Sequence, residues 1–248
     1  MTDTATRLRC ISWNVHRGRG QDGRVDPART GEVLCREVCA GTPDILCLQE
    51  ADTETPPHRG LLDIAGIEAA TGLTCLHDGP AARWGAESHG FLGVILVLAP
   101  HLGLEELVLL DLPGHCHRGA VVADISCGGE PVRVVGTHLS LGQAARIAQM
   151  RTIGQHLFRR APRQTILMGD LNEWRPWGGL ALSRAVVGLD LRGPARATFP
   201  ATRALLPLDR ILTTAPGAVT QARALDGPGI RAASDHRPLA AVVRLGPR

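Results

Sequence analysis

The amino-acid sequence predicts an α/β fold in which two β-sheets pack face to face and helices cover their outer surfaces. The chain has 248 residues and a mean hydropathy of +0.02, which suits a folded domain with a sizeable core. Its middle part is rich in short apolar segments typical of strands, whereas a doubly wound parallel sheet would alternate strands and helices regularly. The GxGxxG and Walker phosphate loops of such sheets do not occur in the sequence.

The individual elements follow from local patterns, taken in chain order. An apolar segment predicts the first strand at residues 8–15. Residues 26–39 have helical apolar spacing, with Asp26 as a suitable N-cap and Pro27 in the first turn. A short apolar run predicts a second strand at residues 44–48. No linker, repeat or low-complexity tract divides the chain, so residues 1–248 are expected to form one domain.

The remaining elements alternate less regularly. A second helix is expected over residues 61–70, ending near Gly72, and the spacing of residues 142–158 predicts a long helix. Strands are expected in the middle of the chain at residues 90–98, 104–110, 120–125 and 132–137, with a hairpin turn at Gly128 and Gly129. The chain is expected to close with strands at residues 164–168, 208–213 and 238–243, and with a short helix at residues 177–187.

Polar side chains directly follow several of the expected strands. These residues are Asn14 and His16, Gln49 and Glu50, His138, Asp170 and Asn172, and Asp209 and Arg210. The segment just before the last expected strand adds Ser234, Asp235 and His236. Each alone has an ordinary structural explanation, such as a turn cap or a solvated strand end. Six such endings in one chain predict that these groups gather at one rim of the sheets and form a site.

The carboxylates and amides in this set suit the cleavage of a P–O bond by water. Glu50 supplies the oxygen ligands that a hard cation such as Mg²⁺ requires. Asp170 can align the attacking water and take its proton. Asn14 and Asn172 can hold metal ligands or phosphate oxygens.

The imidazoles suit the other half of the reaction. His138 and His236 can donate hydrogen bonds to the phosphoryl group in the transition state. Asp209 can fix the tautomer and the charge of His236, as a carboxylate does for a catalytic histidine. The set therefore predicts a metal-dependent phosphoesterase that uses water as its nucleophile.

At these residues the sequence resembles the endonuclease/exonuclease/phosphatase superfamily, and small bacterial members in particular. The blocks occur in the family order: SWNVHRG (12–18), LCLQE (46–50), HRGAVVADI (117–125), GTHLS (136–140), GDLNEW (169–174), TFPA (198–201), LDRIL (208–212) and SDHRPL (234–239). The resemblance implies a deoxyribonuclease-like fold, a four-layer α-β-β-α sandwich of two mixed sheets with helices on the outer faces. It also implies a metal-dependent phosphoric ester hydrolase.

The resemblance assigns a role to each matching position. The implied metal-binding residues are Asn14, Glu50 and Asp235, with Glu50 as the principal ligand of Mg²⁺ or alternatively Mn²⁺. The implied catalytic residues are His138, Asp170, Asn172, Asp209 and His236. Within that set the histidines contact the scissile phosphate, Asp170 and Asn172 orient the water, and Asp209 pairs with His236. No organic cofactor is implied.

The identity of the substrate stays open between phospholipids or other small phosphate esters and nucleic acid. A net charge of +3 is modest for a dedicated nucleic-acid binder. His138 stands where abasic-site endonucleases of the family have Tyr, which disfavours DNA repair. The middle strand GVILVL (93–98) lacks the Asn and Ser of many relatives, so substrate contacts there can differ. A catalytically silent phosphate-binding module is a further alternative.

Several other sequence features are interpreted as structural or have a role that the sequence does not decide. The sequence His115-Cys116-His117 has no second cluster spaced to complete a zinc site and is interpreted as a loop. The roles of the Arg17/Arg19 loop and of Trp174 and Trp177 stay open between substrate contact and ordinary packing or solvation. The seven cysteines form no CxxC pair, and residues 1–10 contain no apolar signal segment. Both observations predict a cytoplasmic protein with reduced thiols. No stable membrane insertion is expected, and no protein partner can be inferred.

Overall fold

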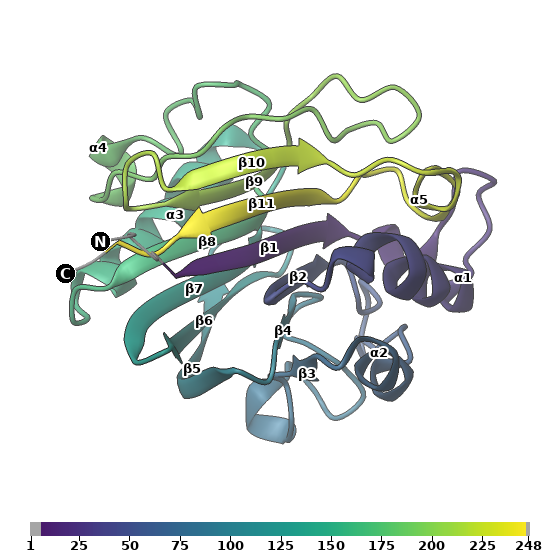
Figure 1. Ribbon diagram of the computed structural model, residues 1–248. Helices are drawn as coiled ribbons and strands as arrows, with labels where there is room; N and C mark the ends of the chain where they lie inside the picture. The colour runs from purple at the N-terminus through teal and green to yellow at the C-terminus, as the bar shows by residue number, and fades with distance from the viewer. Residues whose placement is uncertain (1–5, 247–248) are drawn as a thin grey trace.

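Two β-sheets pack face to face in the computed structural model, which describes residues 6–246 (Figure 1). One sheet has six strands in the order β10-β11-β1-β2-β4-β3, and the other has five in the order β5-β6-β7-β8-β9. The strands are β1 (Arg7–Asn14), β2 (Ile45–Gln49), β3 (Thr74–Cys75), β4 (Ile95–Leu98), β5 (Leu102–Leu112), β6 (Arg118–Cys127), β7 (Glu130–His138), β8 (Gln164–Asp170), β9 (Asp209–Thr213), β10 (Val219–Ala224) and β11 (Leu239–Arg244). Both sheets are mixed, because β1 pairs with β2 and β7 pairs with β8 in parallel.

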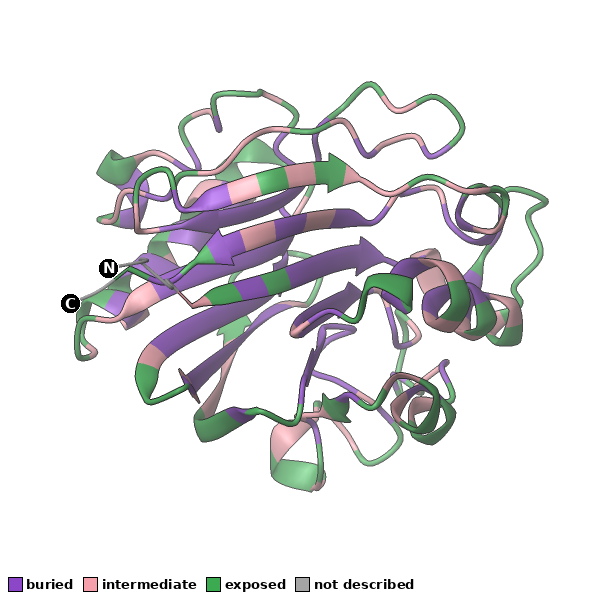
Figure 2. Cartoon of the chain, viewed as in Figure 1, coloured by how far each residue is buried: buried purple, intermediate pink, exposed green. Residues whose placement is uncertain are grey.

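The main core lies between the two sheets, and Figure 2 shows that much of their strands is buried. Leu8 and Leu96 of the six-stranded sheet share this core with Val121 and Ile166 of the five-stranded sheet, and all four are fully buried. Alternate strand residues point to opposite faces, so each sheet also buries an apolar outer face under helices.

The helices form the two outer layers. They are α1 (Pro27–Val33), α2 (Ile64–Thr71), α3 (Gln143–Phe158), α4 (Arg184–Val187) and α5 (Pro228–Ala233), and a π-helix (Leu34–Val38) continues α1. Leu34 and Ile230 join a second core with Trp13 on the outer face of the six-stranded sheet. Met150 of α3 packs against Leu167 on the outer face of the five-stranded sheet. The predicted four-layer sandwich is therefore confirmed.

Several element boundaries differ from the sequence prediction for local reasons. The helix expected from residue 61 begins at Ile64, because the Asp63 side chain caps it by accepting from Gly66 N at 3.0 Å. The helix expected at residues 177–187 is confined to α4, since Gly178 and Gly179 have positive φ values that interrupt it. Within residues 6–246 no helix combines the length and apolar character needed to cross a bilayer.

The strand expected at residues 90–98 is shorter than predicted, and three elements were not predicted at all. Phe91 and Val94 close a tight turn, so β4 begins only at Ile95. β3 has only two residues, and α5 is a short segment that contains a glycine. β10 is an edge strand interrupted by a bulge at Gln221, whose φ is 51°. Such short or irregular elements carry little periodicity in their sequence.

The strand register places the polar strand ends next to one another. Asn14 at the end of β1 pairs with Gln49 at the end of β2. His138 at the end of β7 pairs with Asp170 at the end of β8, and Asp170 lies opposite Asp209 at the start of β9. The predicted gathering at one rim thus follows directly from the parallel pairing of the central strands.

Candidate active site

Asn14 joins the two sheets at this rim. Its amide Nδ2 donates to Glu50 Oε1 at 3.2 Å and to Asp170 Oδ2 at 3.0 Å. Asn14 and Asp170 are almost fully buried, and the side chain of Glu50 is 12% exposed. One amide therefore fixes two carboxylates from different sheets within a single cluster.

Asp170, Asn172 and His138 form the part of the site contributed by the five-stranded sheet. The Asn172 backbone N donates to Asp170 Oδ1 at 3.0 Å, and its side-chain Nδ2 donates to Leu139 O at 2.9 Å. Asn172 has a φ of 50°, a left-handed conformation that asparagine adopts more readily than most residues. His138 Nε2 lies 3.5 Å from Asp170 Oδ2.

His236 and Asp209 form a buried pair beside this cluster. His236 Nδ1 lies 2.9 Å from Asp209 Oδ2, and its Nε2 lies 3.7 Å from Asp170 Oδ2. The Thr198 hydroxyl donates to Asp209 Oδ2 at 2.5 Å, and the Phe199 ring packs against the imidazole with centroids 4.9 Å apart. Thr198 was not predicted as a site residue, although its TFPA block was recognised. Thr198 and Asp209 are 11 positions apart in the sequence, so their contact could not be inferred from the block alone.

The loop that carries His236 is held against the end of β1. Trp13 Nε1 donates to His236 O at 3.0 Å. The Ser234 hydroxyl donates to Asn14 O at 2.7 Å and accepts from His236 N at 3.1 Å. Residues more than 200 positions apart thereby set the direction of the imidazole.

The surroundings of the two histidines drive their protonation in opposite directions. Burial acts to lower the pKa of His236, but the carboxylates of Asp209 and Asp170 outweigh it and raise that pKa to about 10. Burial, with Arg118 and His236 adding positive charge, holds the pKa of His138 well below its usual range. Burial also raises the pKa of Asp170 to about 6, with Asp209 adding to the effect and His236 opposing it.

The contact with Arg118 favours one of the two neutral tautomers of His138. Its Nη1 lies 3.2 Å from His138 Nδ1, and a guanidinium can only donate. Nδ1 is therefore the acceptor, and the neutral ring carries its proton on Nε2, the nitrogen that faces Asp170. Asn172 Nδ2 donates one hydrogen to Leu139 O and lies 3.3 Å from His138 Nε2, so its second hydrogen competes for this nitrogen. The charged guanidinium of Arg118 is the stronger of the two donors.

We expect NMR spectra of the metal-free protein at about pH 8 to show His236 as imidazolium and His138 as neutral imidazole. A pKa of about 10 keeps His236 protonated there, whereas an ordinary histidine would be neutral. Because the folded-state pKa is raised, the stability from this pair is fully present below about pH 6.5 and is lost as the pH rises toward 10. The His236→Ala spectrum identifies the signal. Deprotonation of His236 near pH 6.5 would contradict the assignment.

Three buried carboxylate oxygens at the site accept no hydrogen bond: Glu50 Oε2, Asp209 Oδ1 and Asp235 Oδ1. Glu50 Oε2 is instead 2.6 Å from the guanidinium of Arg17. Buried carboxylate oxygens that accept no hydrogen bond are suitable ligands for a hard divalent metal, so this donor set fits one. Asp235 adjoins the cluster through His16, whose Nδ1 lies 3.4 Å from Asp235 Oδ1. His16 in turn donates its backbone N to Asn14 Oδ1 at 2.9 Å. His16 thus links two of the expected metal-binding residues.

A second carboxylate cluster could also be considered for the metal. Single ligand atoms of Asp170, Asp209 and His236 lie within 4.8 Å of one another. His236 would have to lose its proton to bind a metal, and its raised pKa of about 10 makes that loss costly. We therefore favour the side of the site around Glu50.

A network of buried arginines supports the loops that carry the site. Glu173, which follows Asn172, is fully buried and lies 3.4 Å from Arg146 Nη2 and 2.9 Å from Arg175 Nη1. Arg146 also donates to the carbonyls of Ser140 and Leu141 in the loop after His138. Arg210, next to Asp209, is 1% exposed and donates to the carbonyls of Glu173 and Arg175. No sequence pattern predicted this network.

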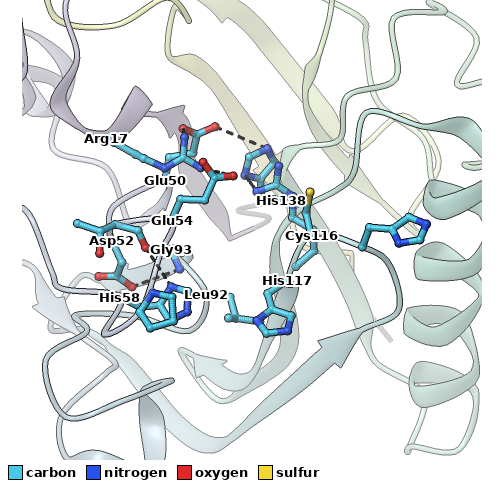
Figure 3. A pocket seen from close by; sticks show the side chains of 14 residues that line it. Arg17, Glu50, Asp52, Glu54, His58, Leu92, Gly93, Cys116, His117 and His138 are labelled. Carbon is cyan, nitrogen blue, oxygen red and sulfur yellow. Dashed lines mark hydrogen bonds and ion pairs between the residues drawn. The ribbon is translucent and has the colours of Figure 1, made fainter.

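A pocket of about 300 Å³ opens directly from the site. Figure 3 shows Arg17, Glu50 and His138 on one side of it and His58 and His117 on the other. Side chains of the predicted site thus border a cavity of the size of a small ligand.

Comparisons with known proteins agree with this architecture. The profile of the Endonuclease/Exonuclease/phosphatase family matches residues 11–236. A search of the curated protein sequences found no match. Members of the matched family are generally hydrolases of phosphate esters.

Several solved structures share the fold at low sequence identity. An endonuclease/exonuclease/phosphatase from Bacteroides vulgatus is 16% identical with a TM-score of 0.74, covering 97% of this chain and 100% of that one. The human Nocturnin catalytic domain with bound sulfate is 22% identical with a TM-score of 0.67, covering 95% and 93%. Truncated Caenorhabditis elegans TDP2 is 17% identical with a TM-score of 0.67, covering 96% and 98%. With the profile match over nearly the whole chain, the protein belongs to the endonuclease/exonuclease/phosphatase family.

Proposed function

We propose that the protein is a divalent-metal-dependent phosphoesterase that hydrolyses a phosphodiester or phosphomonoester with water. The observation that carries the proposal is the convergence of Glu50, Asp170 and the His236–Asp209 pair around Asn14. The family is dependent on divalent metals, and the carboxylate oxygens around Glu50 that accept no hydrogen bond suit one. We propose Mg²⁺ as the ion, with Mn²⁺ as an alternative, held by Glu50, Asn14 and Asp235.

The side chains divide the chemistry among them. Asp170, with its two oxygens directed by Asn14 and Asn172, takes the proton of the attacking water. His236, protonated and held by Asp209, donates to the phosphoryl oxygens as negative charge develops there. His138 donates its Nε2–H to the same group. A bound divalent cation would polarise a phosphoryl oxygen and neutralise part of that charge.

The pocket favours a small phosphate ester, including the headgroup of a phospholipid, over a nucleic-acid duplex. A volume of about 300 Å³ is at the lower end of ligand sites and suits a phosphoryl group with a small substituent. Its walls include Arg118, His58 and His117, which offer hydrogen bonds to a polar substituent. Nuclease activity on DNA or RNA and a silent phosphate-binding role are the alternatives. The cysteines are free, which suits our proposal of a cytoplasmic location.

A substrate screen tests this proposal. Phospholipids, inositol phosphates, a chromogenic diester, single-stranded DNA, abasic duplex and RNA are compared with Mg²⁺, with Mn²⁺ and with EDTA. We expect turnover of small esters that EDTA abolishes and that His236→Ala lacks. Faster turnover of a nucleic acid would favour the nuclease alternative. Metal binding without turnover of any substrate would favour the silent module.

A further inference from the structure

Arg17 lies directly on the carboxylate that is expected to hold the metal. Its Nη1 is 2.6 Å from Glu50 Oε2, and Figure 3 shows the two side chains together at one end of the pocket. The contact is an ion pair without the alignment of a hydrogen bond, because Glu50 Oε2 accepts no hydrogen bond despite this short distance. A cationic side chain therefore already neutralises Glu50 in the metal-free protein.

The backbone brings Arg17 to this position by a sharp turn after β1. His16 and Arg17 have φ values of 47° and 52°, in the left-handed region that non-glycine residues rarely adopt. The His16 backbone N donates to Asn14 Oδ1, which closes the turn over the site. A strained turn of this kind persists where the surrounding structure holds it, and such turns cluster at functional sites.

Arg17 and a divalent cation cannot both occupy Glu50 Oε2. Two cations at contact distance of one oxygen repel each other, so metal binding there requires the guanidinium to move. The Arg17 side chain is 29% exposed and borders the open pocket, so it has room to do so. Its second contact, Nη2 to Glu54 Oε1 at 3.6 Å, is with a side chain that is 63% exposed and holds it weakly.

We propose that the guanidinium of Arg17 pairs with Glu50 before the metal binds. When the metal binds to Glu50, it displaces the guanidinium, which then contacts the substrate phosphate. A guanidinium is the preferred bidentate partner of phosphate, and the pocket that Arg17 borders is where the phosphate is expected. Metal and phosphate then bind cooperatively, because each favours the displaced position of Arg17. This inference rests on the proposed function. The opposing interpretation is a permanent structural ion pair.

Isothermal titration of the metal-free protein with Mg²⁺ tests the first step. Arg17→Met removes the competing cation, and we expect it to bind Mg²⁺ about five- to tenfold more tightly than the wild type. Arg19→Met is the matched control, since Arg19 lies in the same loop but donates to Gly23 O. It should bind Mg²⁺ as the wild type does. Arg17→Gln provides a second variant, and circular dichroism verifies the fold of each.

The same titrations with saturating inorganic phosphate test the second step. Loss of a nearby positive charge could by itself strengthen metal binding, so the discriminating quantity is the factor by which phosphate tightens Mg²⁺ binding. We expect this factor to be several-fold larger in the wild type and in Arg19→Met than in Arg17→Met. Direct attraction between metal and phosphate is common to all the proteins and cancels in the comparison.

The possible outcomes separate this inference from the proposed function. Mg²⁺ binding that is equally tight in the wild type and in Arg17→Met, or an unchanged phosphate factor, overturns the role of Arg17 and leaves the phosphoesterase proposal standing. If none of the proteins binds Mg²⁺ or Mn²⁺, the metal site itself is wrong, and both proposals fall.

Discussion

Replacement of Asp170 by asparagine is expected to lower kcat by about 10²- to 10⁴-fold, the usual contribution of a positioned general base. The amide retains the shape of the carboxylate, but its single oxygen can accept from Asn14 Nδ2 or from Asn172 N and not from both, so circular dichroism should verify that the variant is folded. The amide cannot take a proton from water. Steady-state kinetics on the best substrate from the screen, with saturating Mg²⁺, measures the effect.

Two controls test whether the loss of kcat comes from the chemical step. Asp111→Asn changes an exposed carboxylate on β5 and should leave kcat unchanged. Titration calorimetry should show that Asp170→Asn still binds Mg²⁺, because Glu50 is retained. A variant that keeps wild-type kcat would show that Asp170 does not act as the base.

Replacement of Glu173 by alanine is expected to lower the free energy of unfolding by about 3–5 kcal/mol, the usual result of removing one partner from a buried ion pair. The side chain of Arg146 is 3% exposed and would be left without its carboxylate partner. For a chain of this length, the loss corresponds to a fall in Tm on the order of 10 °C. Urea unfolding and thermal melting measure the two quantities.

Glu32→Ala is the matched control for Glu173→Ala. Glu32 also pairs with an arginine, at 3.0 Å from Arg36 Nη1, but both side chains are well exposed on the surface. Exposed pairs at this helical spacing contribute about 0.3–0.5 kcal/mol. Equal destabilisation by the two substitutions would show that the buried network does not support the site loops as described.

The fold could be predicted from the sequence where elements were long and regularly patterned. The hairpin of β6 and β7 and the long helix α3 had clear periodicity, and both were placed to within a few residues. β10 could not be predicted because an edge strand with a bulge at Gln221 buries too little to impose alternation. The order of strands in each sheet is set by contacts between distant segments, which local patterns do not contain.

The polar residues at the strand ends of the candidate site could be predicted from the sequence, but the contacts that hold them in place could not. Asn14, His138 and Asp170 follow apolar runs, and parallel pairing is sufficient to bring such ends together. The contact of Arg17 with Glu50 joins residues 33 positions apart through a left-handed turn, and no spacing rule foresees it. The roles assigned to the predicted site residues stay predictions until kinetics test them.

A crystal structure with Mn²⁺ and phosphate tests most directly whether this cluster is a metal-dependent phosphate site. We expect an anomalous peak within coordination distance of Glu50, and a phosphate between that peak and the imidazole of His236. Mn²⁺ bound only among Asp170, Asp209 and His236, or phosphate bound away from both histidines, would contradict the account.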